Sequence, residues 1–283
     1  MSTILERAGN RALFTKPAGA LAYGLVFSPF VARYLGTYGY AMQTRFLGGD
    51  DMPFIDWGYE EDPPMGVPLP AEEEPNRYGI QLYHSTASQW DIAGKKVLEV
   101  SCGHGGGAEY LATTMKPAAY TGLDVNAPGV EFCRKTRRQP NLDFVCGNAQ
   151  ELPLQSETYD AVINVEAGHL YHDFRAFLSE VNRVLKPGGH FLYADCRARR
   201  DVPEWDEALK AFPLRVESWR DIHKEICLGM DGSSVASVEL INKKVPALLR
   251  GISKEFYCLP GSLMYRSMED GGIAYRMYDF VKD

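Results

Sequence analysis

VLEVSCGHGGGAEYL, residues 97–111, has the pattern of a buried strand, a tight glycine turn and the start of a helix. Such a turn brings backbone N–H groups and a helix N-terminus close to a nucleotide-like ligand. Glu99 lies inside the strand, where a carboxylate is costly to bury unless it meets a partner. An acid just upstream of a glycine turn suggests a ligand that is cationic as well as nucleotide-like.

The same turn fits a second class of protein. Residues 103–108 read GHGGGA, which satisfies the G-x-G-x-x-A form of the dinucleotide fingerprint. An NAD-dependent dehydrogenase is therefore an alternative, although no convincing set of hydride-transfer residues follows in the second half of the chain. A non-catalytic protein that keeps the cofactor site is a third possibility.

Composition is that of an ordinary globular protein. The chain has 283 residues, 45% hydrophobic and 24% charged, which suffices for one large domain with an appendage. A net charge of -7 argues against a general nucleic-acid surface, which needs a basic face. The six cysteines form no C-x-x-C pair and no cluster with histidine, so we expect reduced thiols in a cytoplasmic protein and no metal site.

Strands and helices alternate in the middle of the chain. This alternation predicts an α/β fold with a mostly parallel sheet covered on both faces. The motif KPGG at residues 186–189 is expected to separate the last helix from the last of these strands. The expected strands are 97–100, 120–125, Leu142–Cys146, Tyr159–Val165 and 190–194, and the expected helices are 108–115, 129–138 and 174–185.

Four regions are predicted. Residues 1–90 form a cap of helices and a proline- and acid-rich loop, and residues 91–196 form the cofactor-binding core. Residues 197–256 are expected to be mainly helical and to serve as a substrate lid inserted before the last two strands. Residues 257–283 are expected to supply those two strands, the second over Ile273–Val281.

An uncharged segment, residues 17–32, stands out in the cap. It is shorter than the ~20 residues that cross a bilayer and contains Pro29 and two glycines, so no stable membrane insertion is expected. Its aromatic residues, such as Tyr23, suit packing on a neighbouring subunit. We therefore expect a homo-oligomer in which this segment makes the contact.

Polar residues follow the second and third predicted strands. Asp124 ends the second strand, where a carboxylate can accept both hydroxyls of a ribose. Asn148 follows the third strand and can address the amino group of an adenine, while the backbone N–H of Ala149 meets a ring nitrogen. These positions favour an adenosine-containing ligand.

Five segments in this order resemble the class I S-adenosylmethionine-dependent methyltransferases: LEVSCGHGGG, TGLDV, CGNAQELP, YDAVINVEAGH and EVNRVLKPGG. The resemblance implies a Rossmann-like sheet of seven strands with the last one antiparallel, S-adenosylmethionine as cofactor and S-adenosylhomocysteine as product. From residue 54 onwards, WGYEEDPPM, EPNRYGIQLYH and YRMYDF resemble actinobacterial phthiotriol-type dimycocerosate methyltransferases and the indole-terpenoid (teleocidin) C-methyltransferases. Two positions depart from the pattern, since Ser101 replaces a glycine and Asn148 stands where many members carry Asp.

The resemblance also implies a set of cofactor residues. Gly103 and Gly105 let the donor approach the backbone, Glu99 orients the loop or the ligand's ammonium, and residues 164–166 form a wall beside the methionine moiety. The complete expected set is Tyr83, Glu99, Ser101, Gly103, Gly105, Asp124, Val125, Asn126, Asn148, Ala149, Gln150, Asn164, Val165 and Glu166.

His169 and Glu166 are the expected catalytic residues. His169 lies just beyond the fourth strand as a proton acceptor or substrate positioner, with a purely structural hydrogen bond as the alternative. Glu166 stabilises positive charge on the substrate or holds the methionyl amine, whereas His104 is expected at the surface. The expected acceptor-binding residues are Tyr23, Trp57, Tyr59, His169, Trp205, Phe212 and Trp219.

The sequence thus predicts methylation of a hydrophobic small molecule of secondary metabolism. Because the segment Glu166-Ala167 followed by His169 resembles the sterol C-methyltransferases, the favoured reaction is C-methylation of an isoprenoid alkene. A π bond then attacks the methyl group, and the carbocation loses a proton or drives cyclisation. The alternative is O-methylation of a polyketide-derived lipid alcohol, with His169 as general base.

Overall fold

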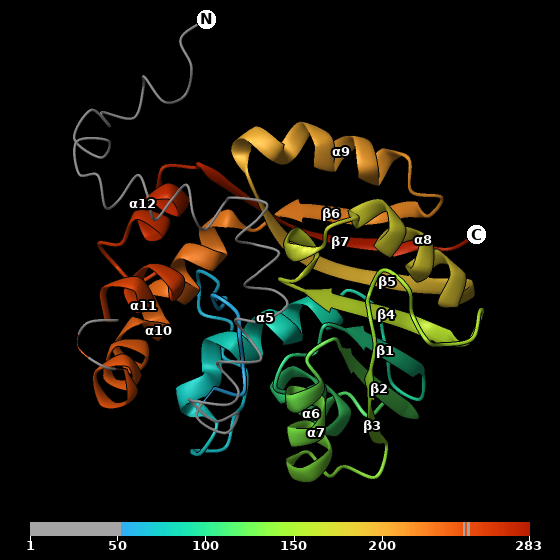
Figure 1. Ribbon diagram of the computed structural model, residues 1–283, viewed down its shortest axis with the longest axis horizontal. Coiled ribbons are helices and arrows are strands. Elements are labelled where there is room, and N and C mark those ends of the chain that lie inside the picture. Colours follow the sequence, from blue (N-terminus) through green and yellow to red (C-terminus); the bar gives the residue numbers. More distant parts are fainter. Residues whose placement is uncertain (1–51, 246, 248–249) are drawn as a thin grey trace, which may run out of the picture.

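A seven-stranded sheet forms the centre of the molecule (Figure 1). The computed structural model describes residues 52–245, 247 and 250–283. The strand order is β3-β2-β1-β4-β5-β7-β6, and β7 runs antiparallel to both of its neighbours. This arrangement confirms the expected fold class. The strands are β1 (Lys96–Val100), β2 (Ala119–Asp124), β3 (Leu142–Cys146), β4 (Tyr159–Val165), β5 (Leu185–Ala198), β6 (Arg215–Asp221) and β7 (Ile273–Val281).

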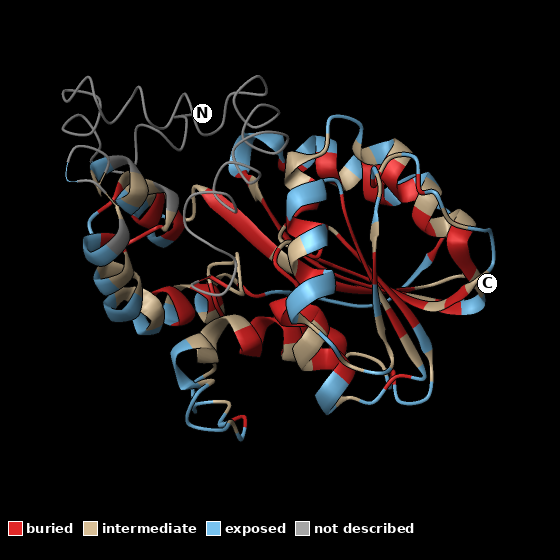
Figure 2. Ribbon diagram, turned by 60° about the horizontal axis from the view of Figure 1, so that its bottom comes forward, coloured by how far each residue is buried: buried red, intermediate tan, exposed pale blue. Residues whose placement is uncertain are grey.

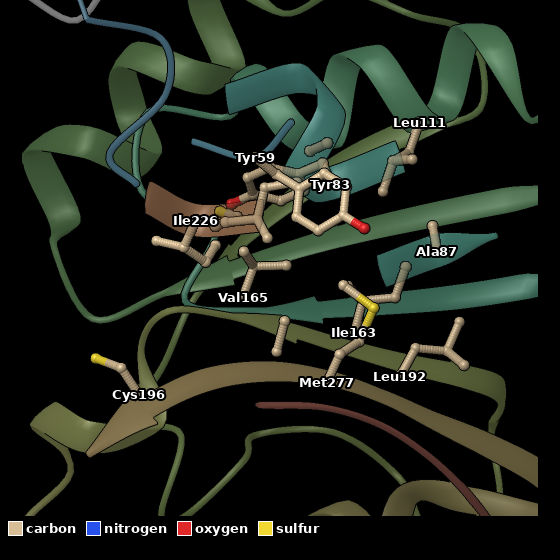
Figure 3. Close-up of a cluster of buried hydrophobic side chains, with 14 of the residues drawn as sticks. Tyr59, Tyr83, Ala87, Leu111, Ile163, Val165, Leu192, Cys196, Ile226 and Met277 are labelled. Atoms are coloured by element: carbon tan, nitrogen blue, oxygen red, sulfur yellow. The ribbon is translucent and has the colours of Figure 1, made fainter. Parts of the chain in front are cut away.

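Helices cover both faces of this sheet, and each face buries its own apolar cluster. Successive strand residues point to opposite faces, so Val97 packs with Leu111 and Ile226 on one side, while Leu98 packs with Phe177 on the other (Figure 3 shows part of the first cluster). The helices are α5 (Arg77–Ala87), α6 (Gly106–Thr114), α7 (Ala127–Thr136), α8 (Phe174–Val184), α9 (Val202–Lys210), α10 (His223–Lys244), α11 (Arg250–Phe256) and α12 (Leu263–Glu269), with short 3-10 turns η3 (Glu74–Asn76), η4 (Gly168–Leu170) and η5 (Arg199–Asp201).

Burial follows this layering. Figure 2 shows the strands as a buried centre between helices whose outer faces are exposed. The helix α8 illustrates the cause, because its buried residues Phe177, Leu178, Val181 and Val184 recur at the three- and four-residue spacing of one helix face. The side chain of Asp173 caps its first turn by accepting a hydrogen bond from the Ala176 N–H at 2.9 Å.

The region after residue 196 differs from the expectation. Residues 197–256, expected to be mainly helical, contain β6 as well as helices, and residues 257–283 supply one strand instead of two. The helices α10, α11 and α12 are therefore inserted between β6 and β7. The motif at residues 186–189 is also part of β5, where the Gly188 N–H donates to the Lys282 carbonyl at 2.7 Å.

β6 escaped prediction because of its position at the sheet edge. All of its residues, RVESWRD, are exposed, so the sequence lacks the alternation of a half-buried strand. Pairing with β7 on one side holds it in the sheet.

Residues 17–32 and Tyr23 lie outside the described residues. Among the residues that are described, no helix has the length and apolar character needed to cross a membrane.

Candidate functional site

The glycine turn after β1 has a backbone that favours glycine. Ser101, Gly103 and Gly105 all have left-handed φ angles, of 64°, 55° and 75°. A side chain at Gly107 would meet the ring of Tyr83 at 2.1 Å, and one at Gly106 would meet the Pro53 carbonyl oxygen at 2.5 Å. The turn is therefore packed tightly between α5 and residues 52–58, here called the strap.

A cavity of 330 Å³ lies at the carboxyl ends of the central strands, where open α/β sheets bind their ligands. Most of the cofactor residues expected from the sequence line it, together with two residues of the strap, Pro53 and Ile55. The expected residues in its wall are Tyr83, Ser101, Gly103, Asp124, Val125, Asn126, Asn148, Ala149, Gln150, Val165 and Glu166.

Asp124 is the buried acid of this cavity. Its Oδ2 accepts from the Gly103 N–H at 2.9 Å, and its Oδ1 accepts from the Asn126 N–H at 2.8 Å. Burial raises the pKa of Asp124, and these backbone hydrogen bonds oppose the rise. The carboxylate thus ties the glycine turn to the end of β2 and faces the cavity from its floor.

Three expected cofactor residues do not line the cavity. Glu99 is buried in β1, where its Oε2 accepts from the Tyr120 hydroxyl at 2.8 Å and burial raises its pKa to about 7. Gly105 faces the core beside Phe144. Asn164 donates to the Val100 carbonyl at 2.8 Å and to the Tyr171 hydroxyl at 2.9 Å. These residues lie behind the cavity wall.

Tyr171 was missed from the sequence and lies at a junction. Its hydroxyl is 2.7 Å from the Ser101 Oγ, so the serine that replaces a glycine has a specific partner. Tyr171, which follows η4, lines both the 330 Å³ cavity and a larger one.

His104, which was expected at the surface, is buried. Its Nδ1 lies 2.9 Å from the Met52 carbonyl oxygen.

These residues fit S-adenosylmethionine. A side chain at Gly103 would lie 3.3 Å from the Ile55 side chain, so the glycine leaves open the gap between turn and strap. The buried Asp124 suits ribose hydroxyls, and Asn148 and Ala149 lie where an adenine edge is expected. Glu166 lines the same cavity and offers a carboxyl group to the methionine part.

A second cavity of 1020 Å³ adjoins the first. Its walls come from the strap, the segment after β4, the start of α9 and one side of α10. This volume is at the upper end of ordinary small-molecule sites. Six residues line both cavities and mark their junction: Pro53, Ile55, Glu166, Leu170, Tyr171 and His172.

His169 lines the larger cavity and is paired with Asp195 of β5. The His169 Nδ1 lies 2.8 Å from the Asp195 Oδ1, and the Asp195 Oδ2 accepts from Tyr193 and Arg197 at 2.7 and 2.6 Å. Burial would raise the pKa of Asp195, but Arg197 and His169 hold it well below its usual range. An ionised carboxylate that fixes one ring nitrogen leaves the other, Nε2, for a ligand.

The sulfur of Cys196 adds a third possible metal donor to this pair. Ligand atoms of His169, Asp195 and Cys196 lie within 4.8 Å of one another. Both oxygens of Asp195 already accept hydrogen bonds, and burial raises the pKa of the Cys196 thiol well above its usual range. The cluster therefore favours a hydrogen-bonded histidine over a metal-ligand set.

Glu166 lies at the junction with a left-handed φ of 50°. Its Oε2 accepts from the Trp57 N–H at 3.0 Å and from the Tyr275 hydroxyl at 3.2 Å. Burial, followed by the charge of Asp56, raises its pKa well above the usual range. The strap is thereby tied to the end of β4 through an acid that faces both cavities.

The aromatic residues expected to bind the acceptor fall into two groups. Trp57 and Trp205 line the larger cavity. Tyr59 and Phe212 are buried in the apolar clusters and line neither cavity, whereas Trp219 is 58% exposed on β6, stacked against Tyr278. Of the three aromatic residues at predicted lid positions, Trp205 alone lines the larger cavity, while Phe212 packs in the core and Trp219 at the sheet edge.

Known proteins with similar sequences are methyltransferases. Residues 98–193 match the family described as a methyltransferase domain. The chain is 52% identical over 246 residues to the phthiotriol/phenolphthiotriol dimycocerosates methyltransferase of Mycobacterium tuberculosis, covering 87% of this chain and 91% of that one. It is 51% identical over 243 residues to the fatty-acid O-methyltransferase of Mycolicibacterium smegmatis, covering 86% and 88%.

Solved structures share the fold at low identity. The geranyl diphosphate C-methyltransferase of Streptomyces coelicolor A3(2), crystallised with S-adenosylhomocysteine, has a TM-score of 0.61 at 17% identity and covers 89% of this chain and 98% of that one. The [4+2]-cyclase SpnF has a TM-score of 0.67 at 18% identity, covering 89% and 96%. Nothing in these matches supports a dehydrogenase. The chain therefore belongs to the class I S-adenosylmethionine-dependent methyltransferases, and S-adenosylmethionine is its methyl donor.

Proposed function

We propose that this enzyme methylates a hydroxyl oxygen of a long, apolar lipid. The observation that carries the proposal is the His169–Asp195 pair in the wall of a 1020 Å³ cavity that adjoins the cofactor cavity. A hydroxyl is a weak nucleophile until a base accepts its proton. The pair supplies such a base at the place where an acceptor would lie.

The roles of the side chains follow from their contacts. When bound, S-adenosylmethionine supplies an electrophilic methyl group. His169 accepts the hydroxyl proton at Nε2, and the ionised Asp195 orients the ring through Nδ1 and stabilises the imidazolium. Arg197 holds Asp195 in its ionised form, and its guanidinium packs over the rings of Phe174 and Trp205. Tyr171 and Ile55 line both cavities at the junction, where the methyl group would pass.

Burial, and after it the neighbouring acids, favours a neutral acceptor near Glu166 over a fatty-acid carboxylate. Asp56 and Asp195 both interact electrostatically with Glu166, and Arg197 is already paired with Asp195. Burial raises the pKa of Asp56 to about 7, and its Oδ2 is buried with no hydrogen-bond partner among the described residues. A further negative charge here is unfavourable, whereas a hydroxyl is not.

C-methylation of an isoprenoid alkene, the reaction favoured in the sequence analysis, is the second candidate. Glu166 accepts hydrogen bonds from the Trp57 N–H and the Tyr275 hydroxyl. The ring centroids of Trp57 and Tyr275 are 6.3 Å apart. An acid with aromatic neighbours suits a carbocation. The relatives described above are methyltransferases of a fatty acid and of dimycocerosates, so O-methylation has the stronger support.

Labelled methyl transfer separates these candidates. Purified enzyme is incubated with S-adenosylmethionine carrying a CD3 group and, separately, a long-chain diol, a fatty acid of matched length and an acyclic isoprenoid alkene. We expect an O–CD3 ether from the diol in deuterium NMR and mass spectra, and far slower ester formation from the acid. A C–CD3 product from the alkene, with the diol unchanged, would falsify the proposal.

We also propose that the enzyme is a cytoplasmic homo-oligomer whose residues 17–32 contact a neighbouring subunit. The aromatic, uncharged character of that segment supports the proposal. Deletion of the first 35 residues is expected to lower the mass measured by light scattering to that of a single shortened chain. An oligomer of unchanged subunit number would contradict it.

A further inference from the structure

One face of α10 forms a wall of the larger cavity. Ser233, Ala236, Ser237 and Leu240 all line it, and they recur at the spacing of a single helix face. Val235 on the same helix does not line the cavity and is 68% exposed to solvent. The helix therefore presents two serines, an alanine and a leucine to the cavity, together with the charged Glu239 and Lys243, and leaves the apolar Val235 outside it.

We propose that this face of α10 is the chain-binding wall, which selects acceptors by the length of a linear apolar chain. The inference rests on the proposed function, because it assigns a place to the lipid chain whose hydroxyl is methylated. From Ser233 to Leu240 the wall spans about 10 Å of helix. The chain-binding wall is separate in the sequence from the residues that line the cofactor cavity and from the His169–Asp195 pair.

Part of the chain-binding wall is apolar. The Ser233 hydroxyl donates to the Met230 carbonyl of its own helix at 3.2 Å. Ala236 and Leu240 add only hydrocarbon, and Trp205 and Ala208 of α9 also line the cavity. A hydrocarbon chain gains free energy when it is buried against these apolar surfaces.

Close packing fixes the wall in place. A side chain at Gly229 would lie 2.3 Å from the Tyr59 backbone nitrogen, and one at Gly232 would lie 2.1 Å from the ring of Tyr78. These glycines let α10 approach the strap and α5 more closely than any side chain allows. The part of α10 just before the wall is therefore held against the strap and α5, and volume added on the cavity side of the wall is expected to come out of the cavity.

Charged residues mark where the cavity opens. Glu204, Glu239 and Lys243 line it and are exposed to solvent. Glu239 lies between Ala236 and Leu240 in the sequence and Lys243 follows within one turn, so the apolar surface that α10 offers to a chain is short. The gain from each added methylene is therefore expected to stop at a defined chain length.

A chain-length series tests the inference. For wild-type enzyme we expect kcat/KM for primary alcohols to rise by up to about fourfold per methylene and then level off. Ala236→Trp is expected to level off at a shorter chain and to lose at least ~10-fold on the longest acceptor, with the shortest acceptor within about twofold. Val235→Trp, the matched control on the outer side of the helix, keeps the wild-type profile. An Ala236→Trp profile identical to wild type, or lowered equally at every length, overturns the inference.

Direct binding separates this inference from the proposed function. Binding of a fluorescent long-chain alcohol to each variant is measured without the methyl donor, and Ser237→Phe serves as a second filling variant if Ala236→Trp does not fold. If both filling variants lose probe binding while no alcohol is methylated by wild type, the proposed function is wrong and the chain wall stands. If alcohols are methylated and neither variant shifts the profile or the binding, the chain wall is wrong and the proposed function stands.

Discussion

His169→Ala is expected to lower kcat/KM for a hydroxyl acceptor by about 10²–10⁴-fold, the contribution of a positioned general base. The substitution removes the base proposed to accept the hydroxyl proton, and Asp195 is fully buried behind the ring. Steady-state kinetics with a long-chain diol measure the loss. Affinity for S-adenosylhomocysteine, measured by calorimetry, is expected to stay within about threefold, because His169 does not line the cofactor cavity.

The chain offers a matched control for this pair. His190 and Asp279 repeat the same contact, Nδ1 to Oδ1 at 2.8 Å, but neither residue lines the 330 Å³ cavity or the 1020 Å³ cavity. His190→Ala is expected to cost stability and to leave kcat/KM within about threefold of wild type. A loss of less than about fivefold in His169→Ala would show that the histidine only supports the cavity wall.

Asp124→Ala is expected to weaken S-adenosylhomocysteine binding by about 10–150-fold, the range for hydrogen bonds to a charged group. The substitution removes the acceptor that faces the cofactor cavity, and it also frees the Gly103 and Asn126 N–H groups that the carboxylate holds. Titration calorimetry measures the change. Asp143→Ala, which removes an exposed acid from the neighbouring strand β3, is the control. Affinity within about threefold of wild type would exclude Asp124 from cofactor binding.

Local sequence patterns were sufficient to predict most strands and helices around the cofactor cavity. Strand β4 was predicted at its observed limits, and α6, α7 and α8 differ from expectation by about two residues at either end. The reason is physical: a strand buried on both faces must be apolar, and a backbone that turns at φ 55° to 75° favours glycine. Asp124 and Asn148 could be placed because the carboxyl ends of parallel strands meet at one edge.

The residues that line the larger cavity are brought together by contacts between segments distant in sequence, which local sequence patterns do not predict. Asp195 lies 26 residues from His169 and inside a strand, so only the pairing of β4 with β5 brings the two together. Trp205 and Trp219 look equivalent in the sequence, yet one lines the cavity and the other is exposed on β6. Edge strands and inserted helices are positioned by neighbours distant in sequence, and single-sequence periodicity does not carry that information.

The insertion of α10–α12 between two paired strands has an evolutionary consequence. The chain leaves the sheet after β6 and returns in β7, and the Ile222 N–H donates to the Tyr275 carbonyl at 3.0 Å where the two strands meet the insertion. Recombination or drift within residues 223–272 can therefore reshape one wall of the larger cavity while the strands that carry the donor site keep their register. Related enzymes with this layout could therefore change their acceptor specificity through substitutions in this one segment and keep the same methyl donor.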